Sequence, residues 1–206
     1  EGGQRGYARG LLQFGESKEQ VRYVFQAFHK RGDGIRDINF NVTDAFGKIA
    51  FDTSKNGELV LKLGFHDEIT DSDAVGLTRA MYLANPRHTS LAINDRMRVD
   101  NYQVSAIHEQ RFSAETKLKT LAYAYKTDRI WRRQDYARGP ALGESYERIV
   151  GDTTFPNGAI YFKNSNSILD RSYDVVGFEP RLEHRFVTLG VQHTLDTGAR
   201  VLVERA

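Results

Sequence analysis

Apolar and polar side chains alternate with a period of two along much of the chain, and a helical period is almost absent. The clearest stretch runs from Glu58 to Asp67. Its apolar positions are every second residue: Leu59, Leu61, Leu63 and Phe65. Similar alternation occurs in residues 101–109, 173–188 and 195–204. Because a β-strand places successive side chains on opposite faces, these stretches predict strands with one apolar face.

The pattern predicts eight strands along the chain. They cover residues 6–14, 19–31, 38–51, 57–69, 98–112, 115–132, 171–189 and 192–206. Most are far longer than the roughly 5–6 residues of an ordinary globular strand. In the third strand the apolar residues change phase between Val42 and Ala45, which predicts a β-bulge near Asp44. The opening strand, around Tyr7 to Phe14, has the weakest alternation.

The predicted connections alternate strictly between short and long. Short turns fall at residues 15–18, 52–56, 113–114 and 189–191, and long connections at 31–37, 70–97 and 133–170. An up-and-down meander places alternate connections at opposite ends of the sheet, so tight turns gather at one end and large loops at the other. That asymmetry is typical of outer-membrane β-barrels. The fold prediction is therefore all-β, an antiparallel up-and-down meander, with a soluble β-sandwich as the alternative.

Composition excludes several classes of protein. The 29 basic and 27 acidic side chains give a net charge of +2, too even for a nucleic-acid-binding surface. There is no cysteine, so neither a disulfide framework nor a thiolate metal site is possible. No apolar run approaches the roughly 18 residues of a transmembrane helix, whereas barrel strands need only alternate. The chain opens Glu1-Gly2-Gly3-Gln4, without signal-peptide features, so we expect an exported protein to have its leader ahead of residue 1.

Four short motifs occur in order along the predicted strands. They are Gly32-Asp33-Gly34-Ile35-Arg36-Asp37; Gly76-Leu77-Thr78 with Tyr82 and Asn85-Pro86-Arg87; Asn94-Asp95-Arg96; and Gly177-Phe178-Glu179-Pro180-Arg181-Leu182 followed by Gly198-Ala199-Arg200. Together they resemble segments of TonB-dependent receptors of the ferric dicitrate type, although Val75 stands where that family has a glycine. The resemblance covers the chain from about residue 20 to residue 206.

This resemblance implies a barrel of about 22 strands in the bacterial outer membrane, with a plug domain in its lumen. Residues 1–206 would supply about eight of these strands, and the plug, the TonB box and the barrel-closing strands would lie outside them. An open run of strands has two unpaired edges, which lipid does not tolerate, so we expect that this chain alone forms no stable transporter.

The implied function is the binding and import of a ferric siderophore or ferric citrate, driven by the TonB complex through the plug. Outer-membrane lipid and lipopolysaccharide are the other implied partners. Two alternatives stay open: the same barrel with a different cargo, such as cobalamin or a glycan, and a soluble β-sandwich that binds carbohydrate or has a structural role.

No motif of an enzyme is present: the sequence lacks G-x-S-x-G, H-E-x-x-H and a Walker loop, so we expect neither catalysis nor a cofactor. Residues 52–57 resemble the first half of a calcium-binding EF-hand loop. However, Leu63 stands at the twelfth position, where a bidentate glutamate is required, and a hairpin turn is the better interpretation. No metal site is predicted.

Arginines at the loop end of the strands are the candidate ligand-binding residues. A chelate such as ferric dicitrate is anionic, and the guanidinium group matches the geometry of a carboxylate. The first candidates are Arg98 and Arg132, followed by Arg96, Arg133 and Arg36. The alternative is that these arginines are solvated loop charges or contact lipopolysaccharide phosphates.

Overall fold

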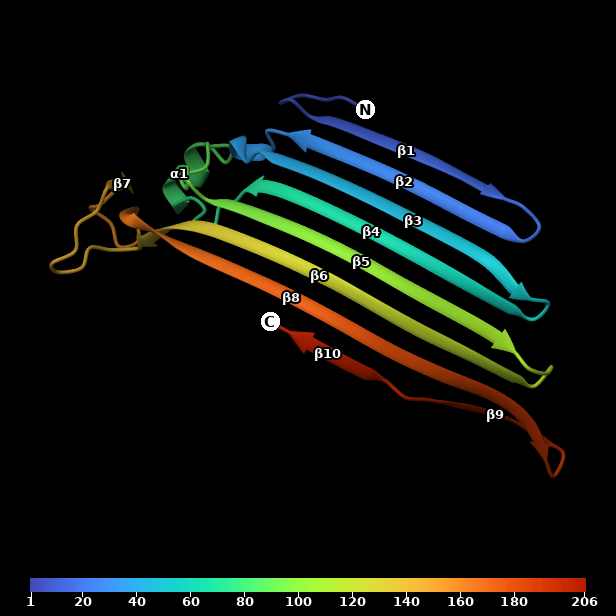
Figure 1. Cartoon of the computed structure of the whole chain (residues 1–206). Helices are drawn as coiled ribbons and strands as arrows, with labels where there is room; N and C mark the ends of the chain where they lie inside the picture. The colour runs from blue at the N-terminus through green and yellow to red at the C-terminus, as the bar shows by residue number, and fades with distance from the viewer.

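A computed structural model describes residues 1–206, and the chain forms one antiparallel sheet (Figure 1). The strands are β1 (Ala8–Ser17), β2 (Val21–Gly32), β3 (Phe40–Ser54), β4 (Gly57–Asp71), β5 (Arg96–Arg111), β6 (Thr116–Ala137), β7 (Arg148–Gly151), β8 (Ala159–Thr188), β9 (Val191–Gly198) and β10 (Val201–Arg205). Their order in the sheet is β1-β2-β3-β4-β5-β6-β8-β10, and β7 and β9 each pair with β8. Neither helix, the 3₁₀ turn Ile35–Asp37 or α1 (Arg79–Ala84), has the length and apolarity needed to cross a membrane.

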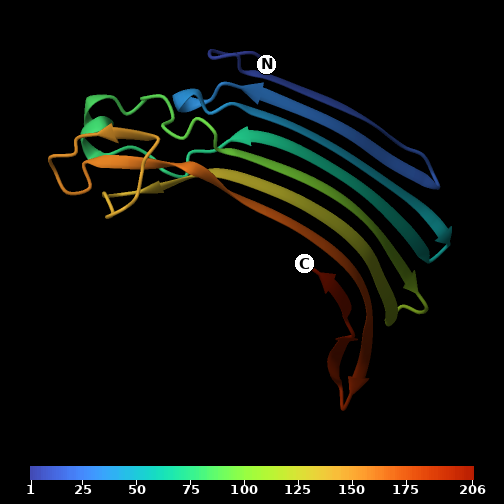
Figure 2. The same cartoon turned by 60° about the vertical axis from the view of Figure 1, so that its left-hand side comes forward.

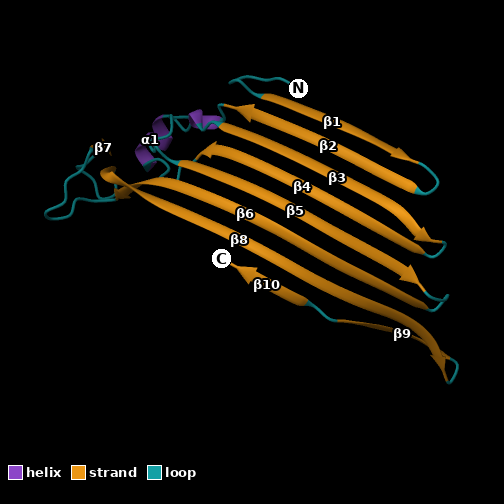
Figure 3. Cartoon of the chain, in the orientation of Figure 1, coloured by secondary structure: helices purple, strands orange, loops and turns teal.

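The connections alternate as the sequence predicted. Tight turns join β1 to β2, β3 to β4, β5 to β6 and β8 to β9 at one end of the sheet. The other end carries the long connections, which contain the 3₁₀ turn, α1 and β7 (Figure 3). The EF-hand-like segment forms the turn between β3 and β4. We call the two ends the turn end and the loop end.

The sheet is a single layer that curves along its strands (Figure 2). All ten strands belong to it, and no second sheet packs against either face. The β-sandwich alternative is therefore wrong, because a sandwich needs two sheets with a shared core. The sheet is also not closed, since β1 pairs only with β2.

The register gives the sheet two different faces. Leu63 lies opposite Val104, Val104 opposite Ala124, and Ala124 opposite Val176, so these four side chains form one row on one face. We call this the belt face, because apolar side chains cross it on every long strand. Its members include Leu12, Phe14, Phe25, Ala27, Ala45, Ile49, Leu61, Phe65, Tyr102, Ala106, Ala122, Phe178, Val201 and Val203.

The opposite face, which we call the polar face, carries charged and polar side chains over the same rows. Lys62, Gln103 and Tyr123 lie on it, one residue away from belt positions. Arg22 on this face makes ion pairs with Asp52 and Glu58. Burial differs between the faces in the same sense: Leu63 on the belt face is 60% exposed, whereas Val60, Val175 and Glu179 on the polar face are buried.

The predicted bulge near Asp44 is wrong. β3 pairs with β4 without interruption from Phe40 to Asp52, and the register shifts only between Asp52 and Ser54. The phase change arises because apolar residues of β3 use both faces. Val42 is buried on the polar face, at 5% exposure, while Ala45 belongs to the belt face.

The predicted last strand is split in two, and Pro180 explains why. Proline has no backbone N–H, so it cannot complete the reciprocal pair of hydrogen bonds in an antiparallel ladder. Ala199 N donates to Pro180 O at 3.1 Å, but the return bond is impossible. The strand is interrupted there, with β9 ending at Gly198 and β10 beginning at Val201.

A small apolar core holds the long connections together at the loop end. Phe162 is fully buried, and Leu91 and Ile160 pack with it. Met81 of α1 and Val150 of β7 cover this cluster from the two long connections. The strands flanking it are longer than predicted: β6 continues to Ala137 and β8 begins at Ala159.

Candidate ligand-binding site

Three arginines lie on the polar face, close to the loop end. Arg129 and Arg133 lie on β6, two residues either side of Trp131, so alternation places all three on the same face as Tyr123. Arg171 lies on β8 directly opposite Arg129. We call Arg129, Arg133 and Arg171 the arginine cluster.

Arg129 and Arg171 have no acid as a direct partner, whereas Arg133 acts electrostatically on the carboxyls of Asp95 and Asp135. Residues directly opposite in an antiparallel pair have their Cβ atoms about 4.5–5.5 Å apart, and like charges there destabilise the sheet. Neither Arg129 nor Arg171 takes part in an ion pair, unlike Arg22 on the same face. The Arg129 Nε atom is buried and has no hydrogen-bond partner. A bound carboxylate or other anion would both satisfy this donor and relieve the repulsion.

Trp131 orients the third member of the cluster. The Arg133 guanidinium lies over the Trp131 ring, 5.2 Å from its centroid. Trp131 Nε1 donates a hydrogen bond of 2.9 Å to Ser72 Oγ, at the start of the long connection between β4 and β5. That connection therefore lies on the polar-face side of β6, and its position is coupled to the arginine cluster.

The predicted candidates divide between the two faces. Arg133 lies on the polar face, but Arg96, Arg98 and Arg132 lie on the belt face, beyond the loop-end limit of its apolar rows. Arg98 Nε donates a hydrogen bond of 3.0 Å to Asp100 Oδ2. Because neighbouring residues of a strand point in opposite directions, Arg132 and Arg133 belong to different surfaces. Their roles as ligand-binding residues stay predictions.

Arg36 lies in the connection between β2 and β3, where its side chain joins two long connections. It makes an ion pair with Asp73, which is 4% exposed at its side chain, and its Nε donates to His88 O at 2.8 Å. Arg36 has a left-handed backbone, with φ of 68°. These contacts use Nη1 and Nε and fix the first loop against the second, while Nη2 is buried without a partner.

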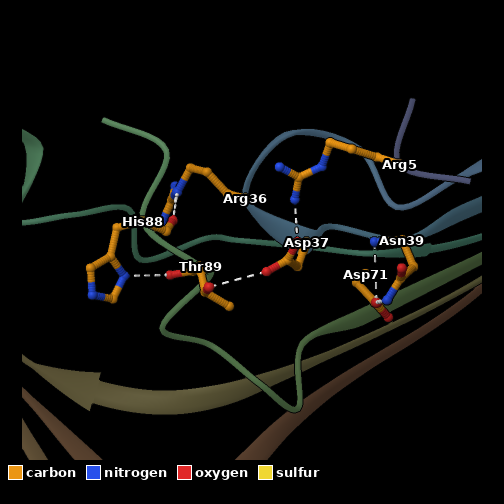
Figure 4. A network of polar contacts seen from close by, with 7 residues as sticks. All are labelled: Arg5, Arg36, Asp37, Asn39, Asp71, His88 and Thr89. Carbon is orange, nitrogen blue, oxygen red and sulfur yellow. Dashed lines mark hydrogen bonds and ion pairs between the residues drawn. The ribbon is translucent and has the colours of Figure 1, made fainter. Parts of the chain in front are cut away.

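Further polar contacts strengthen the same junction (Figure 4). Asp37 accepts from Arg5 and from Thr89 Oγ1, the latter at 3.1 Å. Asn39 Nδ2 donates to Asp71 Oδ2 at 2.8 Å. The N-terminal segment, the first loop and the second loop are thus held in one arrangement above the strands.

Asp95 anchors the end of the second loop. It is 2% exposed, and its Oδ1 accepts from the backbone N–H of Gln134 at 2.6 Å. The other oxygen, Oδ2, is buried without a partner. Burial raises the pKa of the Asp95 carboxyl, although the hydrogen bond from the Gln134 backbone opposes this shift.

Two sequence motifs meet on the polar face nearer the turn end. Glu179, which is 8% exposed, receives Arg200 Nε at 2.9 Å and Arg181 Nη2 at 3.3 Å. Gly177 lies beneath Tyr123, where an added Cβ would stand 2.2 Å from the ring. The Gly-Phe-Glu-Pro-Arg-Leu and Gly-Ala-Arg motifs therefore form one structural unit on adjacent strands.

Arg129 and Arg171 are the two residues of the arginine cluster that are not among the candidates named from the sequence. Arg171 was the harder of the two to find. It sits 38 residues after Arg133 along the chain, in a segment assigned to the edge of a strand. The alternation of side chains along β8 could have placed it. Arg171 and Glu179 are an even number of positions apart and so share one face, opposite to the face of Val176 and Phe178.

Comparisons with known proteins give the fold. No protein-family model and no curated protein matches the sequence. Among solved structures, the open form of the ferric-catecholate import receptor Fiu from E. coli K12 matches with a TM-score of 0.74 and 14% identity, over 98% of this chain and 32% of that one. The unliganded ferric citrate transporter FecA matches with a TM-score of 0.76 and 18% identity, over 98% of this chain and 27% of that one. The siderophore receptor PiuA from Acinetobacter baumannii matches with a TM-score of 0.71 and 12% identity, over 98% of this chain and 29% of that one.

The chain therefore spans about a third or less of the length of these proteins. Its sheet has the fold of the corresponding part of their structures, an antiparallel meander of long strands. This confirms the predicted fold.

Proposed function

We propose that this chain is part of the wall of an outer-membrane barrel that imports an anionic iron chelate, a ferric siderophore or ferric citrate. In this proposal the belt face meets lipid and the polar face lines the interior. The arginine cluster binds the chelate by charge and hydrogen bonds, without covalent chemistry. The named receptors whose fold it shares act on cargo of this kind, which supports the proposal.

The belt face supports contact with lipid. Large apolar side chains stand exposed on strands from one side of the sheet to the other: Leu12 at 72%, Leu63 at 60%, Val176 at 59% and Val203 at 66%. Exposed apolar area on this scale marks an interaction surface. Between the two edge strands, β1 and β10, the backbone groups of the long strands pair within the ladder, as lipid requires.

The observation that carries the binding role is the uncompensated arginine pair on the polar face. Arg129 and Arg171 face each other without an acid, and one buried donor is unsatisfied. Guanidinium groups bind carboxylates in a bidentate manner, and a ferric citrate or carboxylate siderophore presents several carboxylates. The site selects an anion and holds it near the long loops, where cargo arrives.

The rest of the machinery belongs to the same proposal. Residues 1–206 supply about eight strands of a barrel of about 22, whose lumen is plugged by a separate domain. That domain carries the contact to TonB, and the open edges of this sheet pair with further strands of the barrel. Cobalamin and glycan cargoes are the competing candidates, and the charge of the site favours an anion over both.

The test is a pair of double variants in the full-length protein. Arg129→Gln with Arg171→Gln should weaken ferric citrate binding about tenfold or more, since hydrogen bonds to charged groups contribute roughly 1.5–3 kcal/mol each. Binding is measured by titration with ferric citrate, a ferric catecholate and cyanocobalamin at two salt concentrations. Anionic chelates should lose affinity, and cyanocobalamin should show no dependence on these residues.

Arg96→Gln with Arg132→Gln is the matched comparison, because these two arginines are also directly opposite each other but lie on the belt face. Their replacement should leave chelate affinity within about twofold. If this pair weakens chelate binding and the Arg129 and Arg171 pair does not, the proposed site is wrong and the original sequence-based candidates are favoured.

A further inference from the structure

A histidine on the polar face stands between two carboxylates. His66 lies on β4, and its Nδ1 atom is 2.7 Å from Asp44 Oδ1 on β3. Its Nε2 atom is 3.4 Å from the Oε2 atom of Glu68, two residues along β4. A neutral imidazole has a donor on only one ring nitrogen, whereas the protonated ring has a donor on both. The arrangement therefore matches the protonated ring, which satisfies both carboxylates at once.

The two carboxylates approach opposite sides of the ring, so the three groups do not converge on one point and form no metal site. The group has a net charge of about −1 with the ring protonated and about −2 with the ring neutral. A single proton on His66 therefore changes the charge of this part of the polar face.

The other strand positions around His66 add no charge next to the ring. Asn101 of β5 lies directly opposite, and its Nδ2 atom donates to Thr127 Oγ1 of β6 at 2.6 Å. Asp67, the next residue along β4, points to the belt face. Lys62 is on the polar face but four residues away on the same strand. The local charge is thus set by the two carboxylates and the proton on the ring.

Glu68 belongs to the same cross-strand row as the arginine cluster. It lies opposite Val99 of β5, which in turn lies opposite Arg129, and Arg171 continues the row on β8. Two strand spacings of about 4.8 Å place Glu68 roughly 10 Å from Arg129 along this row. Lys30 is two strands away on the other side, and Glu68 has no ion-pair partner except the histidine. An unpaired Glu68 repels an anion bound at the arginine cluster.

We infer that His66 is a specificity-determining residue of the anion site, because a proton on His66 compensates Glu68 and raises the affinity of the arginine cluster for anions. Histidine changes its charge between about pH 5 and pH 8, so affinity increases as the pH falls through that range. The effect grows with the charge of the anion and favours multiply charged chelates over neutral cargo. By linkage, anion binding also draws a proton onto the ring. This inference rests on the proposed binding of an anionic chelate at the arginine cluster.

The experiment measures binding of a substitution-inert metal trioxalate to the full-length protein, because the charge of this trianion is constant over the range in which histidine titrates. From about pH 8 to about pH 5.5 at low ionic strength, the affinity of the parent protein should increase about fivefold, as expected for a unit charge acting on a trianion roughly 10 Å away in water. His66→Gln should keep the weak, alkaline affinity at both pH values.

His29→Gln is the matched control. His29 is an exposed strand histidine on the belt face, and its Nδ1 atom lies 3.0 Å from Thr43 Oγ1 rather than next to an acid. This variant should retain the pH dependence of the parent protein.

Glu68→Gln tests the same inference through a gain of affinity, which misfolding does not produce. The variant should bind the trioxalate at about pH 8 within about twofold of the parent affinity at about pH 5.5, because the repelling charge is absent at every pH. Calorimetric titration in two buffers of different ionisation enthalpy should also show proton uptake on binding by the parent protein and none by His66→Gln.

Three outcomes would overturn the inference: a parent affinity that does not increase at acidic pH, a His66→Gln variant that keeps the parent pH dependence, or a Glu68→Gln variant that binds no more tightly at alkaline pH. Failure of the proposed function gives a different result. In that case Arg129→Gln with Arg171→Gln leaves trioxalate affinity unchanged at both pH values.

Discussion

The two faces of the same strands have opposite relations to their surroundings. On the belt face, Val104 and its neighbours in the row are apolar, and they bury little of one another's surface. On the polar face, side chains reach across strands: Arg200 contacts both Glu179 and Tyr123, at 2.9 and 2.8 Å. One strand thus contributes, residue by residue, to a surface that needs an apolar partner and to a surface stabilised by its own polar contacts.

This difference shows where the information for assembly lies. The backbone ladder is common to both faces, so hydrogen bonds alone do not distinguish them. The distinction comes from side-chain parity, which a slip of one residue would invert for a whole strand. Substitutions at adjacent positions should therefore have unequal effects, and they provide direct tests of the comparison.

The largest effect is expected for a charge placed on the belt face. Val104→Arg should destabilise the membrane-inserted protein by about 2–4 kcal/mol, the range for an arginine facing lipid near the bilayer midplane. Gln103→Arg, at the adjacent exposed position on the polar face, should change stability by less than about 0.5 kcal/mol, as ordinary surface substitutions do. Denaturant-dependent unfolding from lipid vesicles measures both. Equal costs at positions 103 and 104 would remove the distinction between the faces.

A smaller effect is expected from crowding on the polar face. Gly177→Val should cost about 1–3 kcal/mol, because its Cβ would overlap the Tyr123 ring and overpacking carries that penalty. Gly10→Val has open space around its added atoms on the opposite face and should be nearly neutral or slightly stabilising. The same unfolding measurement compares them. A benign Gly177→Val would mean that Tyr123 is not held in place by Arg200 and Glu179.

At the loop end, stability should depend on pH through the buried carboxyl of Asp95. Since burial raises the pKa of Asp95, the folded state binds this proton more tightly than the unfolded state. The contribution of Asp95 is therefore most favourable at acidic pH and is lost as pH rises through the raised folded pKa. Asp95→Asn keeps an oxygen acceptor for the Gln134 N–H but has no titratable group. The variant should therefore not lose stability as the pH rises. Hydrogen exchange in residues 72–95 between pH 4 and 7 should slow in the variant at neutral pH and match the parent protein at acidic pH.

The smallest effect is expected for an exposed ion pair on the belt face at the loop-end limit of the apolar rows, where Lys126 lies opposite Tyr102. Lys126 and Asp128 are both well exposed, and such surface ion pairs contribute about 0–1 kcal/mol. Lys126→Gln should fall in that range and lose its effect at high salt. A cost above 2 kcal/mol would show that this region contacts more than solvent and headgroups.

Most of the fold followed from periodicity because a barrel strand has one strongly apolar face. The alternation of Leu59 to Phe65 located β4, and the order of long and short connections gave the topology. Two features depended on contacts that local pattern does not encode. Val42 is apolar but buried on the polar face, which imitated a bulge, and Pro180 interrupts the strand that pairs with its own in a hairpin.

The candidate site was predictable in residue type but not in place. Arginines near the loop end were expected, yet naming both Arg132 and Arg133 as candidates did not take into account that they point to opposite faces. Ala122 and Ala124 show that even-numbered residues of β6 lie on the belt face. Extending this rule to residues 129–133 would have placed Arg132 on the belt face and Arg133 on the polar face. The ion pair of Arg36 with Asp73 was out of reach, because it joins two irregular connections whose path the sequence pattern does not describe.

The central claim is that the belt face meets lipid while the polar face lines an aqueous interior. The chain contains no cysteine, so single cysteines can be introduced at each position from Tyr102 to Ile107 and spin-labelled in the full-length protein in vesicles. The account predicts a period of two: labels at 102, 104 and 106 respond to a lipid-soluble relaxation agent, and labels at 103, 105 and 107 respond to a water-soluble one. Uniform accessibility along β5, or the inverse phase, would contradict it.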